Sequence, residues 1–309
     1  MADLVTVFGG GGFVGRYVVQ ALLKDGYRVR IAERSPKSAA FLKTQANLGQ
    51  IQFMAADVKR PDTISRALDG AMAAVNLVGV FGAEMDRVQH LGAATVAKGA
   101  KAAGLTVLVQ MSAIGADQAS ASAYGRSKGD GEAAVRAAFP AATIVRPSII
   151  FGREDQFVNR FAAMIRMAPI VPVIGGKTKF QPVHVGDVAR VVAACVADFK
   201  VHSGNIYELG GPQILSMREL NEWVGKSIGR DRLFVDVPDG IAGALARATG
   251  WLPGAPITQD QWLMLQKDNV VGTGALGLDA FGIQPLSLDG AADGWLVQYK
   301  HHGRFGSQS

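Results

Sequence analysis

The sequence predicts an α/β protein in which a doubly wound parallel sheet is joined by a smaller C-terminal α/β substrate domain. In the first half of the chain, short apolar stretches alternate with stretches of helical periodicity. This alternation favours a parallel sheet with helices on both faces. A glycine-rich turn follows the first apolar stretch directly, which is where a sheet of the Rossmann type binds a dinucleotide.

The hydrophobic pattern indicates where these elements begin and end. We expect strands at residues 4–8, 28–32, 51–54, 74–78, 106–111 and 143–145. Helical periodicity covers residues 13–23, 86–103 and 124–138, and a helix and a strand at 183–197 and 205–209 are expected to rejoin the sheet. We therefore assign residues 1–151, with 183–211 returning, to an NAD(P)-binding domain and residues 152–309 to a smaller substrate or partner domain.

Composition excludes several classes of protein. Of the 309 residues, 49% are hydrophobic and 19% are charged, as in ordinary globular proteins. The net charge is +6 but the lysines and arginines are scattered, so we expect no nucleic-acid partner. No uncharged apolar run reaches the ~20 residues of a membrane span, so we expect no transmembrane segment and only peripheral membrane contact. A single cysteine, Cys195, fits a reducing, cytoplasmic setting.

Three glycines in the first turn point to a pyrophosphate site. Gly9, Gly12 and Gly15 give the spacing G-x-x-G-x-x-G between a strand and a helix. The first glycine permits the tight turn, the second permits close approach of the phosphate, and the third permits helix and strand to pack closely. Phe13 and Val14 open the helix, whose N-terminus then faces the pyrophosphate.

The end of the second strand carries groups for the adenine ribose, and they conflict. Glu33 lies 18 residues after Gly15, where an acid binds the ribose 2′-hydroxyl of NAD. Arg34 is adjacent and can bind a 2′-phosphate instead, and Arg16 and Lys37 add positive charge. We favour NADP, with NAD left open.

Two further positions follow from the order of the strands. Asp57 and its neighbour Val58 follow the third strand and are expected at the adenine edge, although a helix or turn cap explains Asp57 equally well. Arg146 and Pro147 should end the sixth strand, so that the loop after Pro147 passes the nicotinamide.

A catalytic-looking pair lies on the helix after the fifth strand. Tyr124 and Lys128 have the spacing Tyr-x-x-x-Lys, which places both side chains on one helix face. A nearby ammonium favours the phenolate and lowers the pKa of a tyrosine, which suits general acid–base work. We expect Lys128 also to hold the ribose hydroxyls.

These motifs together resemble those of the extended and atypical short-chain dehydrogenase/reductases. Residues 146–152 (RPSIIFG) and 181–189 (QPVHVGDVA) add to the likeness. Residues 149–161 (IIFGREDQFVNRF), 47–53 (NLGQIQF) and 74–79 (AVNLVG) are similar to the nucleotide-binding accessory subunits of mitochondrial NADH:ubiquinone oxidoreductase (complex I) and their bacterial relatives. The likeness runs to about residue 269. It implies bound NADP(H) and a stabilising rather than redox role.

One departure from the reductase pattern bears on catalysis. Active members place Ser or Thr after the fifth strand, and the chain reads Gln110-Met111-Ser112-Ala113 there. Ser112 could orient a substrate carbonyl. In the usual doublet, however, the second residue does this work, and that position here is Ala113.

The sequence therefore favours two functions over a third, a purely structural scaffold without nucleotide, which would require the glycine pattern to be idle. The first is an NADP(H)-binding accessory protein of respiratory complex I, cytoplasmic or peripheral at the inner face of a respiratory membrane. The second is an active NADP-dependent oxidoreductase or epimerase on a small carbonyl, quinone-like or sugar-derived substrate, with Tyr124, Lys128 and Ser112 as its catalytic residues. His184 and Asp187 have no evident third ligand, so we expect no metal site.

Overall fold

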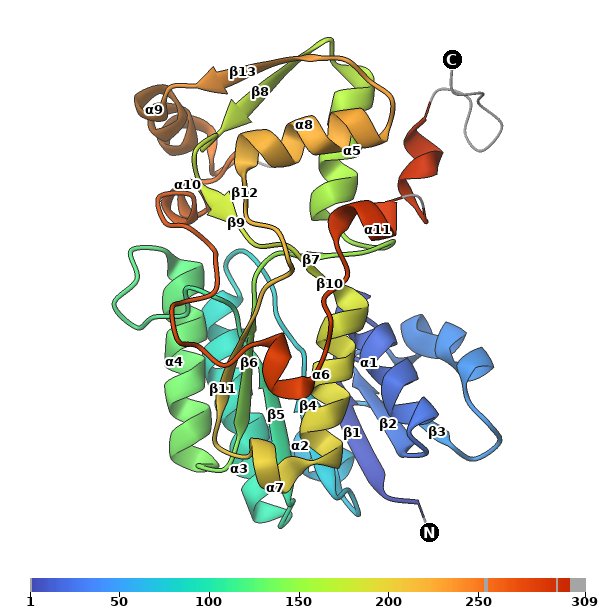
Figure 1. Ribbon diagram of the computed structural model, residues 1–309. Coiled ribbons are helices and arrows are strands. Elements are labelled where there is room, and N and C mark those ends of the chain that lie inside the picture. Colours follow the sequence, from blue (N-terminus) through green and yellow to red (C-terminus); the bar gives the residue numbers. More distant parts are fainter. Residues whose placement is uncertain (1, 253–254, 293, 301–309) are drawn as a thin grey trace. The chain divides into compact units, whose positions relative to one another are not determined.

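The computed structural model describes residues 2–252, 255–292 and 294–300. The described residues form two compact units, whose elements are labelled in Figure 1. The first unit comprises Met1–Pro147, Val185–Leu209 and Thr273–Ile283. The second comprises Ser148–His184, Gly210–Gly272 and Gln284–Ser309.

A seven-stranded parallel sheet forms the centre of the first unit, in the order β11-β6-β5-β4-β1-β2-β3. The order runs outward from β1 and β4 in opposite directions, which is the doubly wound arrangement. The predicted Rossmann-type fold is therefore confirmed. Its strands are β1 (Leu4–Phe8), β2 (Arg28–Glu33), β3 (Ile51–Ala55), β4 (Ala73–Asn76), β5 (Val107–Met111), β6 (Thr143–Pro147) and β11 (Ile206–Leu209).

Helices cover both faces of this sheet (Figure 1). On one face α1 (Phe13–Lys24) packs against α6 (Val185–Ala197), and on the other α3 (Ala93–Ala102) packs between α2 (Pro61–Leu68) and α4 (Ala123–Ala138). Every residue of the central strands β1, β4 and β5 is buried, as expected for parallel strands covered on both sides. None of the helices in the described ranges has the length and apolar character needed to span a membrane.

Two predicted helices begin differently from the expectation. Residues 86–103 start as a π-helical turn, η2 (Asp86–Gly92), before α3 begins. A Cβ at Gly92 would lie 2.7 Å from Val58 Cγ2, so this turn packs closely against the loop after β3. Residues 183 and 184 form strand β10 (Val183–His184), which pairs with β7 (Ile150–Phe151). Helix α6 therefore begins two residues later than the hydrophobic pattern suggested.

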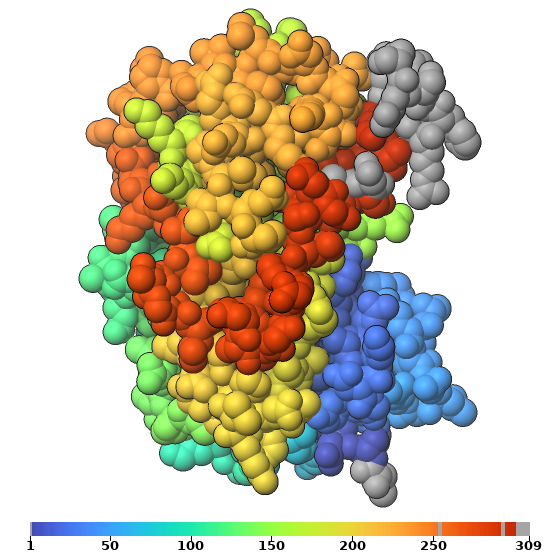
Figure 2. Space-filling model, in the orientation of Figure 1, coloured from blue at the N-terminus to red at the C-terminus, as the bar shows by residue number. Residues whose placement is uncertain are grey.

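One segment assigned to the second domain belongs to the first unit. Thr273–Ile283 carries the short helix η3 (Leu278–Phe281), which packs against α6. Its Phe281 ring stacks 4.5 Å from the ring of His202, in α7 (Phe199–His202). Figure 2 shows this orange-red segment lying over the yellow surface of α6 and α7. These contacts are between residues far apart in sequence, so local patterns did not reveal them.

The second unit is built from three strand pairs and several helices. β7 pairs with β10, β9 (Lys179–Phe180) with β12 (Leu215–Ser216), and β8 (Ile170–Ile174) with β13 (Leu233–Val237). Helices α5 and α8 pack together over a core that includes Phe151, Ile165 and Leu220. The helices of this unit are α5 (Phe157–Met167), α8 (Met217–Ser227), α9 (Asp239–Thr249), α10 (Gln259–Met264), α11 (Leu288–Ala292) and η4 (Leu296–Tyr299).

Candidate functional site

The turn between β1 and α1 is shaped by its glycines. Gly9 has a φ of +81°, a conformation that glycine adopts freely, and its carbonyl accepts the Gly12 N–H at 3.1 Å. A Cβ at Gly15 would run into the Gly9 carbonyl oxygen, so α1 can begin this close to β1 only because position 15 has no side chain. The close packing that the sequence predicted for Gly15 thus has a direct steric cause.

The start of α1 presents backbone donors rather than side chains. No side chain caps the helix at Gly12, and its first turn carries no acid. The N–H groups of Phe13 and Val14 lie in that first turn, where helical N–H groups have no partner within the helix. Together with the positive end of the helix dipole, they form a site suited to a pyrophosphate.

An acid ends β2, and two cations follow it in the sequence. The Glu33 carboxylate reaches into the glycine turn and accepts the Gly11 N–H at 2.7 Å. Arg34 and Lys37 are exposed and have no ion pair within the described part of the chain. The guanidinium carbon of Arg16 lies 4.8 Å from the centre of the Phe41 ring. Groups suited to a 2′-hydroxyl and to a 2′-phosphate therefore stand side by side in sequence at this strand end.

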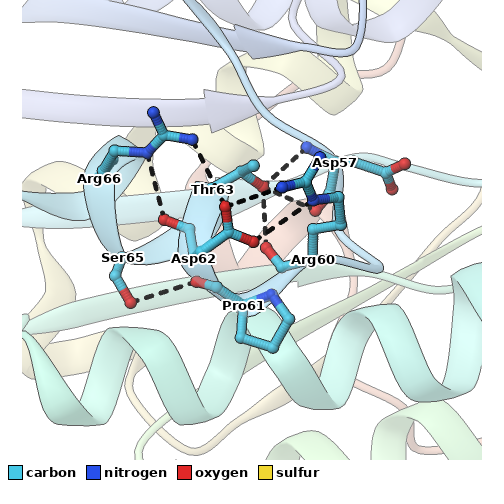
Figure 3. A network of polar contacts seen from close by, with 7 residues as sticks. All are labelled: Asp57, Arg60, Pro61, Asp62, Thr63, Ser65 and Arg66. Carbon is cyan, nitrogen blue, oxygen red and sulfur yellow. Dashed lines mark hydrogen bonds and ion pairs between the residues drawn. The ribbon is translucent and has the colours of Figure 1, made fainter.

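The loop after β3 is held by a local polar network (Figure 3). The Thr63 hydroxyl accepts the Asp57 N–H and donates to the Arg60 carbonyl, while Asp57 Oδ1 accepts the Lys59 N–H at 2.9 Å. Figure 3 shows the Asp57 carboxylate directed away from the ion pair between Arg60 and Asp62. Asp57 is thus a turn cap, one of the two roles considered for it.

Val58, the neighbour of Asp57, is buried in the core of the first unit. Its side chain contributes to packing against η2. Any contact that it makes with an adenine would therefore have to come from its backbone.

Tyr124 and Lys128 lie on α4, which begins at its N-cap Ser122. The Lys128 ammonium lies 5.8 Å from the centre of the Tyr124 ring and donates a long hydrogen bond of 3.5 Å to the Met111 carbonyl. The pair is therefore on one helix face, as the spacing predicted, and next to the end of β5.

The electrostatics of this pair differ from the expectation. Burial raises the pKa of Tyr124 to about 12. Burial also lowers the pKa of Lys128 to about 8, opposed in part by the charge of Glu132. We expected the ammonium to lower the pKa of the phenol. The rise comes instead from the loss of water around the phenol, so the tyrosine stays protonated at neutral pH.

Ser112 lies directly after β5 and is buried. Its backbone N–H donates to the Val145 carbonyl at 2.7 Å. Its hydroxyl oxygen has no hydrogen-bond partner among the described residues, and such a buried group is costly to leave unpaired. The structure thus offers a hydroxyl at the strand end, and the following residue, Ala113, offers none.

The end of β6 is fixed by ion pairs. Arg146 bridges Glu132 of α4 at 2.6 Å and Glu208 of β11 at 3.3 Å, and these hydrogen bonds raise the pKa of its guanidinium. The Pro147 carbonyl accepts the Ile114 N–H at 3.1 Å. Arg146 therefore links β6 to α4 and β11, and Pro147 ends the strand as predicted.

Sequence reasoning missed two residues beside the Tyr-Lys pair. Phe81 follows β4 and stacks on Tyr124 with the ring centres 4.8 Å apart, although 70% of Phe81 is exposed. Gln89 in η2 is buried and donates to the Ser127 hydroxyl at 3.1 Å. An aromatic residue in a glycine-rich loop was a signal for Phe81, whereas Gln89 lies inside an amphipathic stretch that carries no such signal.

A second cluster of polar side chains lies on η2 and α4. The possible metal-ligand atoms of Asp86, His90 and Asp130 all lie within 4.8 Å of one another. Hydrogen bonds already join Asp86 to His90 and Asp130 to Gln118. The only possible metal pair considered from the sequence was His184 and Asp187, which lie in another part of the chain. This cluster was therefore not anticipated.

Comparisons with known proteins agree with the geometry. Residues 5–210 match the model of the NAD dependent epimerase/dehydratase family. NADH dehydrogenase [ubiquinone] 1 alpha subcomplex subunit 9 of Arabidopsis thaliana is 34% identical over 98% of this chain and 80% of its own length. The protein of the same name from Mus musculus is 32% identical over 93% of this chain and 78% of its own. A ceramide reductase of Caulobacter vibrioides is 32% identical over 62% of this chain and 61% of its own.

The solved structures agree on the fold. An Escherichia coli NADPH-dependent quinone oxidoreductase complexed with NADPH has a TM-score of 0.76 at 18% identity, covering 94% of this chain and 99% of its own. The triphenylmethane reductase of Citrobacter complexed with NADP(H) gives the same TM-score, identity and coverage. At this identity the likeness speaks for the fold alone.

The residues described above fit a nicotinamide dinucleotide. The uncapped start of α1 suits its pyrophosphate, and the end of β2 suits its adenine ribose. At the end of β5, the Ser112 hydroxyl has no hydrogen-bond partner among the described residues. Ser112 directly follows Met111, whose carbonyl accepts a hydrogen bond from Lys128. The chain belongs to the NAD dependent epimerase/dehydratase family and, within it, to the group that includes subunit 9 of the alpha subcomplex of mitochondrial NADH dehydrogenase [ubiquinone].

Proposed function

We propose that this chain binds NADP(H) mainly to stabilise its own fold and, in that form, helps to assemble or hold respiratory complex I. The observation that carries the proposal is the likeness to complex I subunits over nearly the whole chain. A protein in this role acts at the inner face of a respiratory membrane, attached through other subunits or through peripheral contact.

A stabilising role for the cofactor is supported by the state of the Tyr-Lys pair. A tyrosine whose pKa is about 12 is a weaker acid than a free tyrosine and is less often ionised at neutral pH. Its pKa lies further from the working pH, at which general acid–base catalysis is most efficient. The residue after Ser112, where the reductase pattern has its working hydroxyl, is alanine. The groups suited to binding the dinucleotide are thus present, whereas Tyr124 and the position of Ala113 depart from what catalysis requires.

We favour NADP over NAD because of the charges after β2. Glu33 is engaged by the Gly11 N–H, while Arg34 and Lys37 are exposed and available for a 2′-phosphate. A guanidinium binds a phosphate through paired, charge-assisted hydrogen bonds. Glu33 opposes this preference by repulsion, so the discrimination between the two cofactors should be modest.

The test is to isolate the protein from the membranes of its native host under mild conditions. We expect complex I subunits to co-purify with it, and we expect released nucleotide to be NADP(H) rather than NAD(H). Recovery of the protein with bound nucleotide but without any complex I subunit, from membranes in which complex I is intact, would contradict the proposed role.

A second candidate function is an active NADP-dependent reductase, which is favoured by the intact Tyr124–Lys128 pair and by the ceramide reductase relative. When bound, the dinucleotide supplies or accepts a hydride. Tyr124 would then donate its phenolic proton to the carbonyl oxygen, Lys128 would stabilise the charge left behind, and Ser112 would orient the carbonyl. A turnover screen over carbonyl substrates, including quinones and oxidised lipids, tests this directly. If the protein is an active reductase, Tyr124→Phe should lower kcat at least about 100-fold.

A further inference from the structure

One face of the β8–β13 pair in the second unit is apolar and open to water. The two strands are parallel, and the residues at their outward positions are Ile170, Pro172, Ile174, Leu233, Val235 and Val237. Of these, Leu233 is 60% exposed and Ile170 is 55% exposed. Parallel strands are normally covered on both faces, so this surface, here called the β8–β13 face, is unusual.

The opposite face of the same pair is already packed. Val171 and Phe234 lie in the core with residues of α5 and α8, and α8 contacts both strands (Figure 1). The outward side chains are therefore not needed to fill that core. An exposed apolar patch with a polar or charged rim marks an interaction site.

The free edge of β8 is unsuited to pairing with a further strand. The Leu233 N–H donates to the Pro169 carbonyl at 3.3 Å, so every second residue of β8, counted from Pro169, is directed toward β13. Pro172 belongs to the other set and therefore leaves the free edge without an N–H. A proline at such an edge discourages the addition of a strand. We therefore expect a partner to cover the β8–β13 face rather than to extend the sheet.

Cations lie at both ends of the β8–β13 face. Because the strands are parallel, Ile170 and Leu233 share one end, where Arg166 lies in the last turn of α5 and Arg232 directly precedes β13. Lys177 follows β8 at the other end and is exposed. These three cations form no ion pair within the ranges that the structure describes.

Acids are scarce around the same face. Residues 160–179 contain four lysines and arginines and no acid. Beside Leu233, Asp231 is exposed, and farther along β13 the carboxylate of Asp236 is paired with Arg218 at 2.7 Å. An apolar surface with cations at its rim is complementary to a bilayer that contains anionic lipids, because burial of apolar area and attraction of charge add together.

We propose that the β8–β13 face docks onto the surface of a membrane that contains anionic phospholipids. Ile170, Leu233 and Val235 enter the headgroup region, while Arg166 and Lys177 lie among the lipid phosphates. This inference rests on the proposed function, which places the protein at a respiratory membrane, and it names the surface through which the protein touches that membrane.

Co-sedimentation of the full chain with phospholipid vesicles tests the proposal. We expect the protein to pellet with vesicles of phosphatidylcholine mixed with phosphatidylglycerol. Vesicles of phosphatidylcholine alone should bind it at least about 10-fold more weakly, because each lysine or arginine near an anionic surface strengthens binding about 5-fold.

Substitutions on the apolar part of the face should have the largest effect. Leu233→Ser combined with Val235→Ser should weaken binding to the mixed vesicles about 100-fold, at about 10-fold for each aliphatic side chain. Both side chains are exposed, so urea denaturation should show an unchanged fold. Leu48→Ser combined with Val201→Ser is the matched control, because these side chains are exposed on the first unit, and this variant should bind like the parent.

The cations are tested in the same way. Arg166→Gln combined with Lys177→Gln should weaken binding to the mixed vesicles more than about 10-fold. Lys24→Gln combined with Lys98→Gln removes the same net charge from exposed positions of the first unit. It should leave vesicle binding nearly unchanged, which separates a local contact from the effect of total charge.

A spin label measures the contact directly. The single cysteine, Cys195, is buried, so a nitroxide can be attached selectively in Val235→Cys, with Val201→Cys as the control. When mixed vesicles are added, the label at position 235 should collide more often with oxygen and less often with an aqueous nickel complex. The label at position 201 should not change.

Three outcomes would overturn the inference. The first is a parent protein that does not pellet with the mixed vesicles, and the second is an equal loss of binding in Leu233→Ser/Val235→Ser and its control. The third is a label at position 235 that is shielded without vesicles, in a dimer seen by sedimentation equilibrium, which would assign the face to a second copy of the chain.

Failure of this inference and failure of the proposed function are distinguishable. Recovery of complex I subunits with a protein that does not bind vesicles would keep the proposed function and reject the β8–β13 face as its membrane contact. Vesicle binding through this face, without any complex I subunit recovered from native membranes, would do the reverse.

Discussion

The glycine turn after β1 and the Tyr-Lys pair on α4 are built on opposite principles. At the turn, shape is dictated by backbone atoms: Gly15 must lack a side chain, and the Glu33 carboxylate is held by the Gly11 N–H. Around the pair, two buried side-chain oxygens, Ser112 Oγ and Gln89 Oε1, have no hydrogen-bond partner among the described residues. The first region is thus fixed by backbone geometry, whereas the second depends on buried polar side chains.

This difference teaches how binding and turnover can separate within one fold. The proposed pyrophosphate site depends on backbone geometry, which persists as long as the glycines persist. Catalysis depends on pKa values near neutrality, and burial moves the pKa of Tyr124 away from that range. A protein of this family can therefore keep its cofactor while its chemistry weakens.

The strongest way to break the first region is Gly15→Ala. The new Cβ would meet the Gly9 carbonyl oxygen, so helix and strand must separate, and we expect a loss of about 3 kcal/mol in the free energy of unfolding. Urea denaturation measures it. Gly240→Ala is the control, because nothing lies within 4 Å of a Cβ at that position in α9. Equal stability of the two variants would mean that the turn is not sterically fixed.

The Tyr-Lys pair should make the free energy of unfolding depend on pH. The pKa of Lys128 is about 8 in the folded protein and near 10.4 in an unfolded chain, so the unfolded state binds more protons between these values. The free energy of unfolding should therefore rise from pH 8 to pH 10, by on the order of 2 kcal/mol. Above pH 10 the raised pKa of Tyr124 acts in the opposite direction, because the unfolded phenol ionises first.

Urea denaturation at pH 8 and pH 10 checks this, with Lys128→Met as the variant. The rise should be absent in Lys128→Met and retained in Lys98→Met, whose lysine is exposed. A rise that persists in Lys128→Met would have to come from another group.

A smaller effect should distinguish the cofactors at the end of β2. We expect Arg34→Ala to weaken NADPH binding about 10-fold, corresponding to about 1.4 kcal/mol for one charge-assisted contact, and to leave NADH binding nearly unchanged. Glu33→Gln should instead increase the preference for NADPH over NADH, because it removes the repulsion of a 2′-phosphate, while it also perturbs the hydrogen bond with the Gly11 N–H. Cofactor fluorescence titrations measure both. Equal losses for NADPH and NADH in Arg34→Ala would remove the argument for NADP.

The smallest expected effect concerns Asp57. Its carboxylate caps the Lys59 N–H, so Asp57→Ala should lower the free energy of unfolding by about 1 kcal/mol. Asp62→Ala, in the exposed part of the same network, should not change stability measurably. If Asp57→Ala also weakens dinucleotide binding several-fold more than Asp62→Ala, the residue serves the adenine as well as the turn.

The sequence predicted those features that depend on neighbours along the chain. The strand–turn–helix with Gly9, Gly12 and Gly15 is local, and so is the Tyr124–Lys128 spacing. The role of Gln89 was not predicted because its partner Ser127 is 38 residues away and its π turn depends on packing against α4. The raised pKa of Tyr124 was not predicted because the spacing reveals the nearby lysine but not the burial of the phenol.

The way the first unit is threaded has a consequence for its synthesis. The sheet takes its edge strand β11 from residues 206–209, α1 is covered by α6 from residues 185–197, and η3 packs on α6 from residues 278–281. A ribosome-bound chain ending at Pro147 would therefore expose β6 as an open edge, and such edges template aggregation. The sheet cannot gain its last strand until residues 206–209 have left the ribosome, so until then β6 stays open to pairing with a strand of another chain.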